Sequence, residues 1–371
     1  MGVPPRGSAA GADLRPDADR HVDSTAVSEA QSDPRASAMA KTFSVGIVGA
    51  GAISRQSHLP VLTTMPQVRV AWIVDSDPVR ARSLARAYRI PAAKLPSSPS
   101  DLSGCEVALL AIPVGVRDSY LDAFARLGIG VLVEKPFART LQAHREILAA
   151  YPPHLLACGF IRRTYASTCL FRRIVEEEWF GPLMKIRARE GSRTGATRTD
   201  RSFFDQPMAT GGGVLAEGGC HALDQALYIT GAAGYDILES RMIFDGSVDR
   251  KAEGRVRLAL EGSGRVAVEY CFSWLDQQPN TLELEFGSVR LVTGTSPDSS
   301  VVIEGLRAAE VAEVTHLAPS QGARTSSQAF RLHWQEFFSG IEEGTESKVS
   351  AASCLSTTAI VEDLYLKARS T

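Results

Sequence analysis

Residues Val45 to Ser54 read VGIVGAGAIS, and this stretch decides the fold of the first half of the chain. The apolar run at 45–48 is typical of a buried strand, and Gly49 and Gly51 form a tight turn between that strand and a helix. The first glycine allows the sharp turn, and the second lets a pyrophosphate approach the N–H groups of the helix. Ser54 stands where a third glycine or alanine is usual. The predicted pyrophosphate contacts are Gly49, Gly51, Ala52 and Ile53.

Asp75 strengthens this interpretation, because it follows the second apolar strand, 21 residues after Ser54. A carboxylate at that place hydrogen-bonds the ribose hydroxyls of NAD and repels the 2′-phosphate of NADP. We therefore expect NAD as cofactor, with NADP still open because Ser76, Arg80 and Arg82 lie close by. The alternative for residues 75–78 is an ordinary turn and helix N-cap. A glycine turn that binds another ligand is the alternative for the whole motif.

Apolar strands separated by helices continue from this motif to residue 133. Strands are predicted at 68–74, 107–112 and 130–133, and helices at 78–88 and after Pro113 to about residue 127. Because these strands are apolar throughout, they indicate a parallel sheet with helices on both faces, as in a Rossmann domain.

The second half of the sequence has a different pattern, in which apolar and polar residues alternate. A helix is predicted at 166–178, and strands at 183–190, 255–260, 265–272, 281–286 and 289–292, with Gly262-Ser263-Gly264 at hairpin spacing. Such alternation predicts a large, mostly antiparallel open sheet with helices on one face. The expected fold class is α/β, with a Rossmann domain at 41–155 and a second α/β domain for substrate binding and oligomerisation at 156–371. A last helix at about 352–368 is expected to pack back on the first domain.

Residues 1–40 contain almost no large apolar side chains and show no periodicity. They cannot bury enough surface to offset their ordering entropy, so we expect a disordered extension. Removal of residues 1–38 is expected to leave folding and activity intact. Met39 is an alternative start of the chain.

Composition limits the classes of partner. The net charge of −2 gives no reason to expect binding to nucleic acid or to an anionic membrane, and a small-molecule substrate fits better. The six cysteines are scattered without metal-ligand spacing, which indicates reduced thiols, no metal and a cytoplasmic protein. No apolar run approaches the ~20 residues of a membrane span.

Several motifs, taken in order, carry a family resemblance. They are GIVGAGAIS at 46–54, the Ala111-Ile112-Pro113 turn, VLVEKPFA at 131–138, GFIRR at 159–163 and GGGVLAEGGCHALD at 211–224. With these motifs the chain resembles the glucose-fructose oxidoreductase, inositol dehydrogenase and MocA family from about Phe43 to its end. The resemblance implies nicotinamide-dependent oxidation or reduction of a sugar, cyclitol or related polyol. It also adds Ile112, Pro113, Glu134 and Lys135 to the expected cofactor contacts.

The resemblance implies that Lys135 lies between nicotinamide and substrate and that His221 and Asp224 match the last polar positions of the second family motif. The family usually has aspartate where this chain has Glu217. Hydride transfer at a carbinol carbon moves a proton on the attached oxygen, so a group such as His221 is needed, with Lys135 polarising that oxygen. The alternatives are a structural histidine and a solvated lysine. Asp224 is expected either to bind substrate or to orient the imidazole.

Arginines are dense between residues 162 and 201. Arg162 and Arg163 enter the second domain and are expected in the substrate cleft with Lys135, Glu217, His221 and Asp224. Lys185, Arg187 and Arg189 share one face of a strand, which favours a solvated or interfacial surface over a phosphate site.

We therefore expect an NAD(P)-dependent oxidoreductase acting on CH–OH groups, with a homo-oligomer plausible through the open sheet face. The first alternative is an NADP-dependent keto-sugar reductase or nucleotide-sugar dehydrogenase. The second is a catalytically silent, cofactor-binding regulatory protein.

Overall fold

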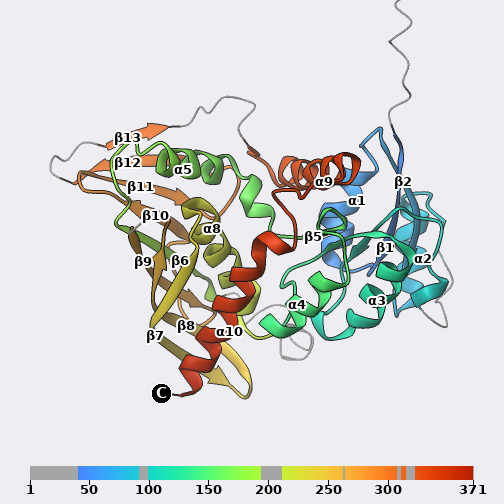
Figure 1. Cartoon of the computed structure of the whole chain (residues 1–371), viewed down its shortest axis with the longest axis horizontal. Helices are drawn as coiled ribbons and strands as arrows, with labels where there is room; N and C mark the ends of the chain where they lie inside the picture. Colours follow the sequence, from blue (N-terminus) through green and yellow to red (C-terminus); the bar gives the residue numbers. More distant parts are fainter. Residues whose placement is uncertain are drawn as a thin grey trace, which may run out of the picture. The chain divides into compact units, whose positions relative to one another are not determined.

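The computed structural model describes residues 41–91, 99–193, 211–261, 264–306, 311–314 and 322–370. Lys41–Thr371 form one compact unit (Figure 1). The expected N-terminal extension and the centre of the Gly262-Ser263-Gly264 turn lie outside the described residues.

The first sheet is parallel and has the strand order β2-β1-β3-β4-β5. Its strands are β1 (Phe43–Val48), β2 (Val68–Val74), β3 (Val107–Leu110), β4 (Gly130–Val133) and β5 (Leu156–Cys158). Almost every residue of β1, β3 and β4 is buried, which confirms the parallel sheet predicted from their apolar sequences. The chain order reverses between β1 and β3, and ligands of such sheets bind at that point, beyond the carboxyl ends of the strands.

Helices cover both faces of this sheet. They are η1 (Ser54–His58), α1 (Leu59–Leu62), α2 (Pro78–Ala87), α3 (Asp118–Leu127) and α4 (Leu141–Ala149), with short 3-10 turns η2 (Pro99–Asp101), η3 (Val114–Val116), η4 (Pro153–Leu155) and η5 (Ile161–Thr164). Asp77 caps α2 by accepting from the N–H groups of Val79 and Arg80, so part of the 75–78 segment is indeed a helix N-cap.

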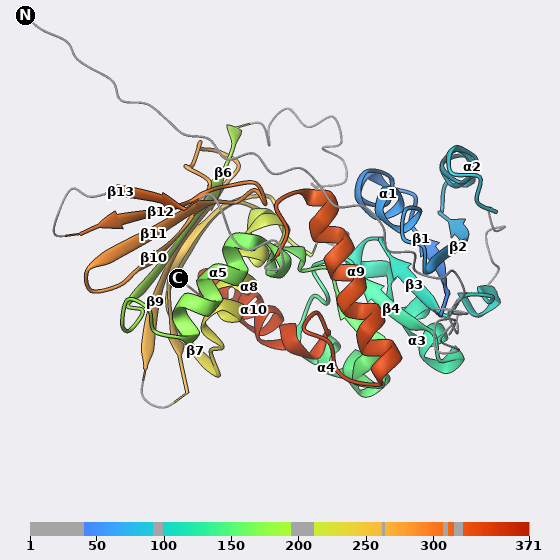
Figure 2. The same cartoon turned by 90° about the horizontal axis from the view of Figure 1, so that it is seen from above.

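A helix that the sequence analysis did not predict, α9 (Ser326–Glu343), packs on the same sheet. Its Phe330, Trp334, Phe337 and Phe338 belong to the core that contains β1 and α1. Figure 2 shows α9 beside the first sheet, although it comes from the end of the sequence.

The second sheet has eight strands in the described residues, in the order β13-β12-β11-β10-β6-β9-β8-β7. They are β6 (Lys185–Gly191), β7 (Gly234–Asp245), β8 (Val248–Ala259), β9 (Arg265–Ser273), β10 (Thr281–Glu285), β11 (Val289–Gly294), β12 (Val301–Gly305) and β13 (Val311–Val314). All neighbours are antiparallel except β6 and β9, which confirms the mostly antiparallel sheet. The helices α5 (Ala166–Glu176) and α8 (Cys220–Thr230) share its core.

The boundary expected between residues 155 and 156 cuts the chain at the first residue of β5, which is hydrogen-bonded into the first sheet. The first sheet therefore extends to Cys158. The last helix, α10 (Leu355–Arg369), follows a 3-10 turn, η8 (Ala352–Cys354). It contacts α4, which covers the first sheet, and also α8 and β7 of the second part. Helix α10 therefore packs against both parts of the fold.

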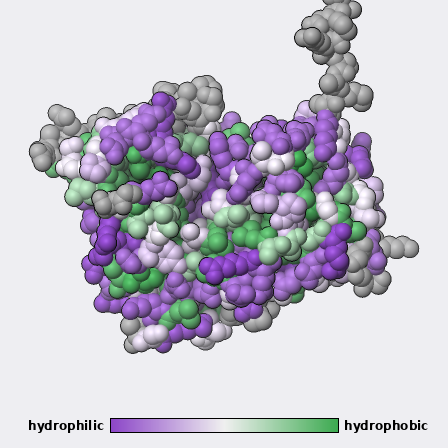
Figure 3. Space-filling model, in the orientation of Figure 1, coloured by the Kyte–Doolittle hydropathy of each residue, from purple (hydrophilic) through white to green (hydrophobic). Residues whose placement is uncertain are grey.

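The face of the second sheet opposite α5 and α8 is charged. Arg187 reaches Glu269 at 3.1 Å and Glu285 at 2.6 Å, and Lys185 lies 3.2 Å from Glu269. These carboxylates form ion pairs with the basic groups. The pairing favours a solvated or interfacial surface over a phosphate site. Figure 3 shows the molecule in the orientation of Figure 1, and this view is mostly hydrophilic, with apolar residues near its middle. None of the described helices is long and apolar enough to cross a membrane.

Candidate active site

The glycine-rich turn after β1 has the geometry of a pyrophosphate site. Gly49 has a φ of 103°, and a Cβ on it would lie 2.3 Å from the main-chain oxygen of Ala111, so only glycine fits. A Cβ on Gly51 would meet no atom within 4 Å, which leaves this part of the backbone open to a ligand. Ser54 is fully buried and donates to the main-chain oxygen of Gly49 at 2.5 Å. The serine therefore closes the turn where the usual motif has a third glycine.

Asp75 lies beside this turn, where the sequence placed it. Its Oδ2 accepts from the N–H of Ala50 at 2.7 Å, and its Oδ1 accepts from Asp77 N–H at 2.8 Å. Arg80 Nη1 lies 3.7 Å from Oδ1. A carboxylate has about four lone-pair sites, so Asp75 can brace the turn and still accept a ribose hydroxyl. These residues fit the adenosine and pyrophosphate parts of NAD.

Two loops beyond β3 and β4 meet at the same edge of the sheet. Ile112 and Pro113 follow β3, and the segment from Glu134 to Pro136 follows β4. Arg117, which is 3% exposed, donates to the main-chain oxygens of Ile112 at 2.9 Å and Pro136 at 2.5 Å. Burial lowers the pKa of Arg117 to about 10, so it remains a cation at neutral pH. Arg117 thus holds the two loops together, a role that no local sequence signal indicated.

The side chain of Glu134 is buried beneath Lys135. Its Oε1 lies 2.8 Å from Nε2 of His58, and its Oε2 accepts from Lys135 N–H at 3.2 Å. Glu134 is only 8% exposed, so its carboxylate binds groups inside the protein and does not line the surface of the expected cofactor site. His58 was not among the predicted site residues.

Lys135 reaches the motif that precedes α8. This motif forms a π-helical turn, η7 (Leu215–Gly219), and Nζ of Lys135 donates to the main-chain oxygen of Glu217 at 2.6 Å. In a π-helix the hydrogen bonds span one residue more than in an α-helix, and such turns are frequent at functional sites. Because Glu217 precedes His221 by four residues, Lys135 lies about one helical turn from His221.

His221 has an unusual environment. Its Nδ1 is buried, and no group of the described chain forms a hydrogen bond with it. The ring packs edge-to-face on Phe160, with centroids 5.7 Å apart. Burial and then the charges of Arg162 and Lys135 lower the pKa of His221 well below its ordinary value. The imidazole is therefore neutral at pH 7 and able to accept a proton.

The turn before η7 is hydrogen-bonded to Asp249 of strand β8. Asp249 is fully buried and accepts from the N–H groups of Gly213 at 2.6 Å and Leu215 at 2.8 Å, and from the hydroxyl of Tyr365 at 2.7 Å. A Cβ on Gly213 would lie 2.0 Å from the main-chain oxygen of Asp249, so this close contact requires glycine. Sequence reasoning found the glycines of 211–213 but not Asp249, which is distant in the chain.

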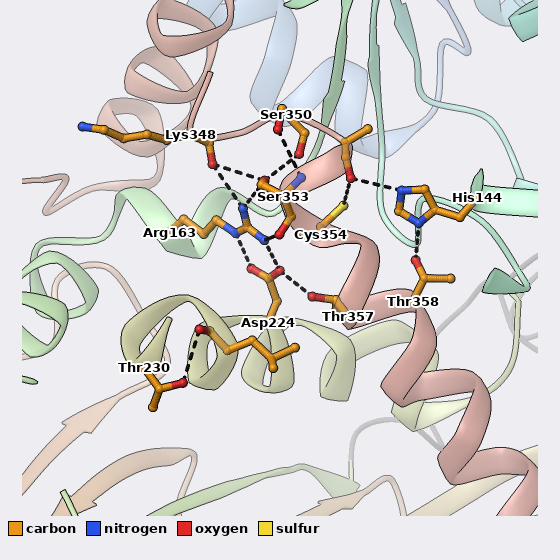
Figure 4. Close-up of polar contacts among 12 residues, drawn as sticks. His144, Arg163, Asp224, Thr230, Lys348, Ser350, Ser353, Cys354, Thr357 and Thr358 are labelled. Carbon is orange, nitrogen blue, oxygen red and sulfur yellow. Dashed lines mark hydrogen bonds and ion pairs between the residues drawn. The ribbon is translucent and has the colours of Figure 1, made fainter. Parts of the chain in front are cut away.

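The two arginines of the GFIRR motif have carboxylate partners. Arg162 pairs with Glu190, with Nη2 2.9 Å from Oε2. Arg163 pairs with Asp224 through two hydrogen bonds of 2.8 and 2.6 Å, and Thr357 donates to the same carboxylate at 2.8 Å (Figure 4).

The pair of Arg163 and Asp224 is closed to solvent, with side chains 5% and 1% exposed. This arrangement differs from the expectation that both contact substrate. Figure 4 shows the pair between α8 and the start of α10, where Arg163 also donates to Ser353 Oγ at 2.6 Å. The reason is that Asp224 points to the side of α8 that faces α10, so the pair fixes α8 and does not enter a cleft.

A cavity of about 150 Å³ lies beside η7. Its lining includes Glu190, Glu217, Phe272, Trp274 and Asn280. It therefore borders on one of the predicted substrate residues and combines polar side chains with two aromatic rings, a lining typical of small-molecule sites.

Comparison with known proteins agrees with this geometry. Residues 43–154 match the family model described as oxidoreductase family, NAD-binding Rossmann fold. An inositol 2-dehydrogenase from Burkholderia vietnamiensis is 31% identical over 173 residues, which cover 44% of this chain and 51% of the relative. A dTDP-3,4-didehydro-2,6-dideoxy-alpha-D-glucose 3-reductase from Streptomyces antibioticus is 24% identical over 188 residues, 50% of this chain and 56% of the relative.

The chain spans about half the length of the curated relatives it matches. Among solved structures, a levoglucosan dehydrogenase in complex with NADH and levoglucosan superposes with a TM-score of 0.74 at 17% identity. That match covers 89% of this chain and 98% of the other, and it supports the fold from the first sheet to the second.

Proposed function

We propose that the chain is a member of the glucose-fructose oxidoreductase, inositol dehydrogenase and MocA family, and that it transfers a hydride between NAD(H) and a secondary alcohol or keto group of a sugar, cyclitol or related polyol. The observation that carries the proposal is the contact of Lys135 with η7, the turn that directly precedes α8 and His221. Lys135 binds the main-chain oxygen of Glu217, and His221, one turn further on, keeps a buried Nδ1 without a protein partner. A buried polar atom of this kind needs an explanation, and a ligand hydroxyl supplies one.

The proposed roles follow from the charges of the two groups. When NAD⁺ is bound, it supplies the acceptor for the hydride. Burial and the charges of Arg162 and Lys135 keep the imidazole of His221 neutral, so we assign to it the proton that leaves the reacting hydroxyl as the hydride is transferred. The ammonium group of Lys135 stabilises the negative charge that develops on the same oxygen. Glu217 contributes its side chain to the substrate cavity and its main-chain oxygen to the orientation of Lys135.

The division of labour in the chain is also a proposal. We assign cofactor binding to the first sheet, up to Cys158, and substrate binding to the second. The proposed cofactor contacts are Gly49, Gly51, Ala52, Ile53, Asp75, Ile112, Pro113 and Lys135. The proposed substrate contacts are Lys135, Arg162, Glu217 and His221, while Arg163 and Asp224 position α8.

A panel of sugars and cyclitols, tested with NAD⁺ and NADP⁺ by absorbance at 340 nm, tests the function. We expect NADH to form with at least one neutral polyol and to disappear when the matching ketone is added. No turnover with any member of the panel, despite NADH binding, would favour the second candidate.

That second candidate is a keto-sugar reductase acting on a nucleotide-linked sugar. It is supported by the similarity to the dTDP-sugar 3-reductase and by Arg80, which is close enough to Asp75 to meet a 2′-phosphate. A panel of dTDP- and UDP-linked keto sugars with NADPH separates it from the first. The catalytically silent alternative has no support in the comparisons.

We also propose a cytoplasmic homo-oligomer. All six cysteines are free, which fits a reducing compartment, and the edge strand β7 of the second sheet exposes Leu238 and Ile243. Light scattering after size exclusion measures the oligomeric state, and a monomer at micromolar concentration would contradict this part.

A further inference from the structure

A chain of buried polar side chains runs from α9 to the end of β4. Trp334 Nε1 donates to Nδ1 of His58 at 3.0 Å, and Nε2 of His58 lies 2.8 Å from Oε1 of Glu134. Trp334 and His58 are fully buried, and the ring of Phe330 packs edge-to-face on His58. His58 therefore has one fixed orientation beneath Glu134.

This geometry determines the protonation of the pair. An indole N–H can only donate, so Nδ1 of His58 is an acceptor, and the single proton of a neutral imidazole is on Nε2. Nε2 then donates to Glu134, which accepts as a carboxylate. Burial acts to raise the pKa of Glu134, but the hydrogen bond of His58 and the charges of Lys135 and Arg117 outweigh it and lower that pKa. A negative charge is thus fixed at the carboxyl end of β4.

The strand order places this charge relative to the bound cofactor. A dinucleotide lies across the point where the order reverses, with its pyrophosphate at the turn after β1. Asp75, after β2, marks the adenosine side. The nicotinamide side therefore lies toward β3 and β4, and Glu134 and Lys135 directly follow β4.

We propose that the Glu134 carboxylate, held by His58 and Trp334, favours the oxidised nicotinamide over the reduced one. The oxidised ring carries one positive charge and the reduced ring carries none, so a fixed carboxylate stabilises the oxidised form selectively. The positive charges of Lys135 and Arg117 disfavour the oxidised ring, and the negative charge of Glu134 opposes their effect. The proposal rests on the proposed function, because it presumes that NAD(H) binds at this edge.

The test measures the affinities of the full chain for NAD⁺ and NADH by calorimetric titration. In Glu134→Gln, which keeps the size of the side chain, the ratio Kd(NAD⁺)/Kd(NADH) is expected to rise on the order of tenfold. Asp75→Asn is the matched control. It also removes a carboxylate, but at the adenosine end, whose charge is the same in both forms, so both affinities change together and the ratio stays constant.

An unchanged ratio in Glu134→Gln, or equal weakening of both forms, overturns the proposal and leaves Glu134 a structural residue. If that variant does not fold, Glu134→Met decides, because it also removes the carboxylate at similar volume and must raise the same ratio. An unchanged ratio in Glu134→Met then overturns the proposal. Failure of the unmodified chain to bind either form refutes the proposed function instead, so the two failures are distinguishable.

Discussion

Nζ of Lys135 donates a hydrogen bond to the main-chain oxygen of Glu217, 2.6 Å away, and so connects the end of β4 to the π-helical turn before His221. The contact joins two motifs that are 82 residues apart. Because the acceptor is the main-chain oxygen of Glu217, the contact does not depend on which side chain stands at this position. The same contact holds the ammonium group of Lys135 at the turn from which α8 and His221 follow.

Replacement of either ionisable group is expected to stop the chemical step and spare cofactor binding. Lys135→Met and His221→Ala should each lower kcat by about 10²- to 10⁴-fold, because each removes a group that moves or stabilises the proton and charge of the reacting oxygen. Titration with NADH should give affinities within a few-fold of the unmodified chain. His154→Ala, in the 3-10 turn η4, is the control and should keep normal turnover.

Glu217→Asp separates the two functions of this residue. The main-chain oxygen that binds Lys135 is unaffected, while the carboxylate withdraws by one methylene from the cavity beside η7. We expect KM to change more than kcat. Near-normal kcat in His221→Ala would contradict the acid/base role and return His221 to a structural one.

Cofactor selection should favour NADH over NADPH. Asp75 sits against the glycine-rich turn and would meet a 2′-phosphate with like charge. Arg80, 3.7 Å from Asp75, reduces the repulsion, so we expect a preference of about tenfold rather than exclusion. Arg80→Ala should weaken NADPH binding further and leave NADH unchanged. Tighter binding of NADPH than of NADH in fluorescence titrations would show that Asp75 does not select the cofactor.

Acidification should destabilise the fold below neutral pH. Burial lowers the pKa of His144 to about 4 and of His333 to about 3, and it lowers the pKa of His221 as well. The histidines of the unfolded chain have pKa values near 6.5 and bind protons that the folded chain does not bind. The free energy of unfolding therefore decreases as the pH falls through 6.5 toward 4. Each histidine contributes up to about 1.4 kcal/mol per pH unit in this window.

The measurement is the melting temperature between pH 8 and pH 5. It should be level above pH 7.5 and fall below pH 6.5. His144→Gln removes one of the titrating groups and should reduce the slope. A melting temperature that is constant from pH 7.5 to pH 5 would contradict the neutral, buried state of these histidines.

The sequence predicted the parallel sheet well because each strand is apolar throughout, a pattern that exposed segments rarely show. Helix α9 was missed, although Phe330, Trp334, Phe337 and Phe338 recur at helical spacing and all pack on β1 and α1. Strand β7 was missed for a different reason. Half of its residues are apolar, but irregular pairing at Ile237/Glu239 and Ile243/Phe244 interrupts the alternation of apolar and polar residues that marks a strand.

At the site, the motifs identified Lys135, Glu217 and His221, which the structure brings together around η7. The groups that hold them were not predictable, because their contacts join distant segments. Asp249 holds the turn before η7 from a β-hairpin, and Arg117 holds two loops through main-chain oxygens. Charge and spacing alone do not show which partner a buried carboxylate or guanidinium finds. The same reason explains why Asp224, the last residue of a site motif, binds Arg163.

The pair of Arg163 and Asp224 should therefore matter for stability. Burial would lower the pKa of Arg163, but the adjacent carboxylate of Asp224 raises it, so the guanidinium stays charged inside the protein. Asp224→Ala leaves the guanidinium buried without its partner and should destabilise the fold by about 3 to 5 kcal/mol. The cost arises because Ser353 and the main-chain oxygen of Lys348 still bind Arg163 but do not neutralise it.

The matched control is the exposed pair of Arg172 and Glu176, also 2.6 Å apart, on helix α5. Glu176→Ala should change stability by less than about 0.5 kcal/mol, because solvent screens exposed ion pairs. In urea unfolding, the double variant Arg163→Met with Asp224→Leu should recover much of the loss, since it removes both charges and keeps the volume. Equal, small effects of Asp224→Ala and Glu176→Ala would show that water reaches the buried pair and would reopen direct substrate contact by Asp224.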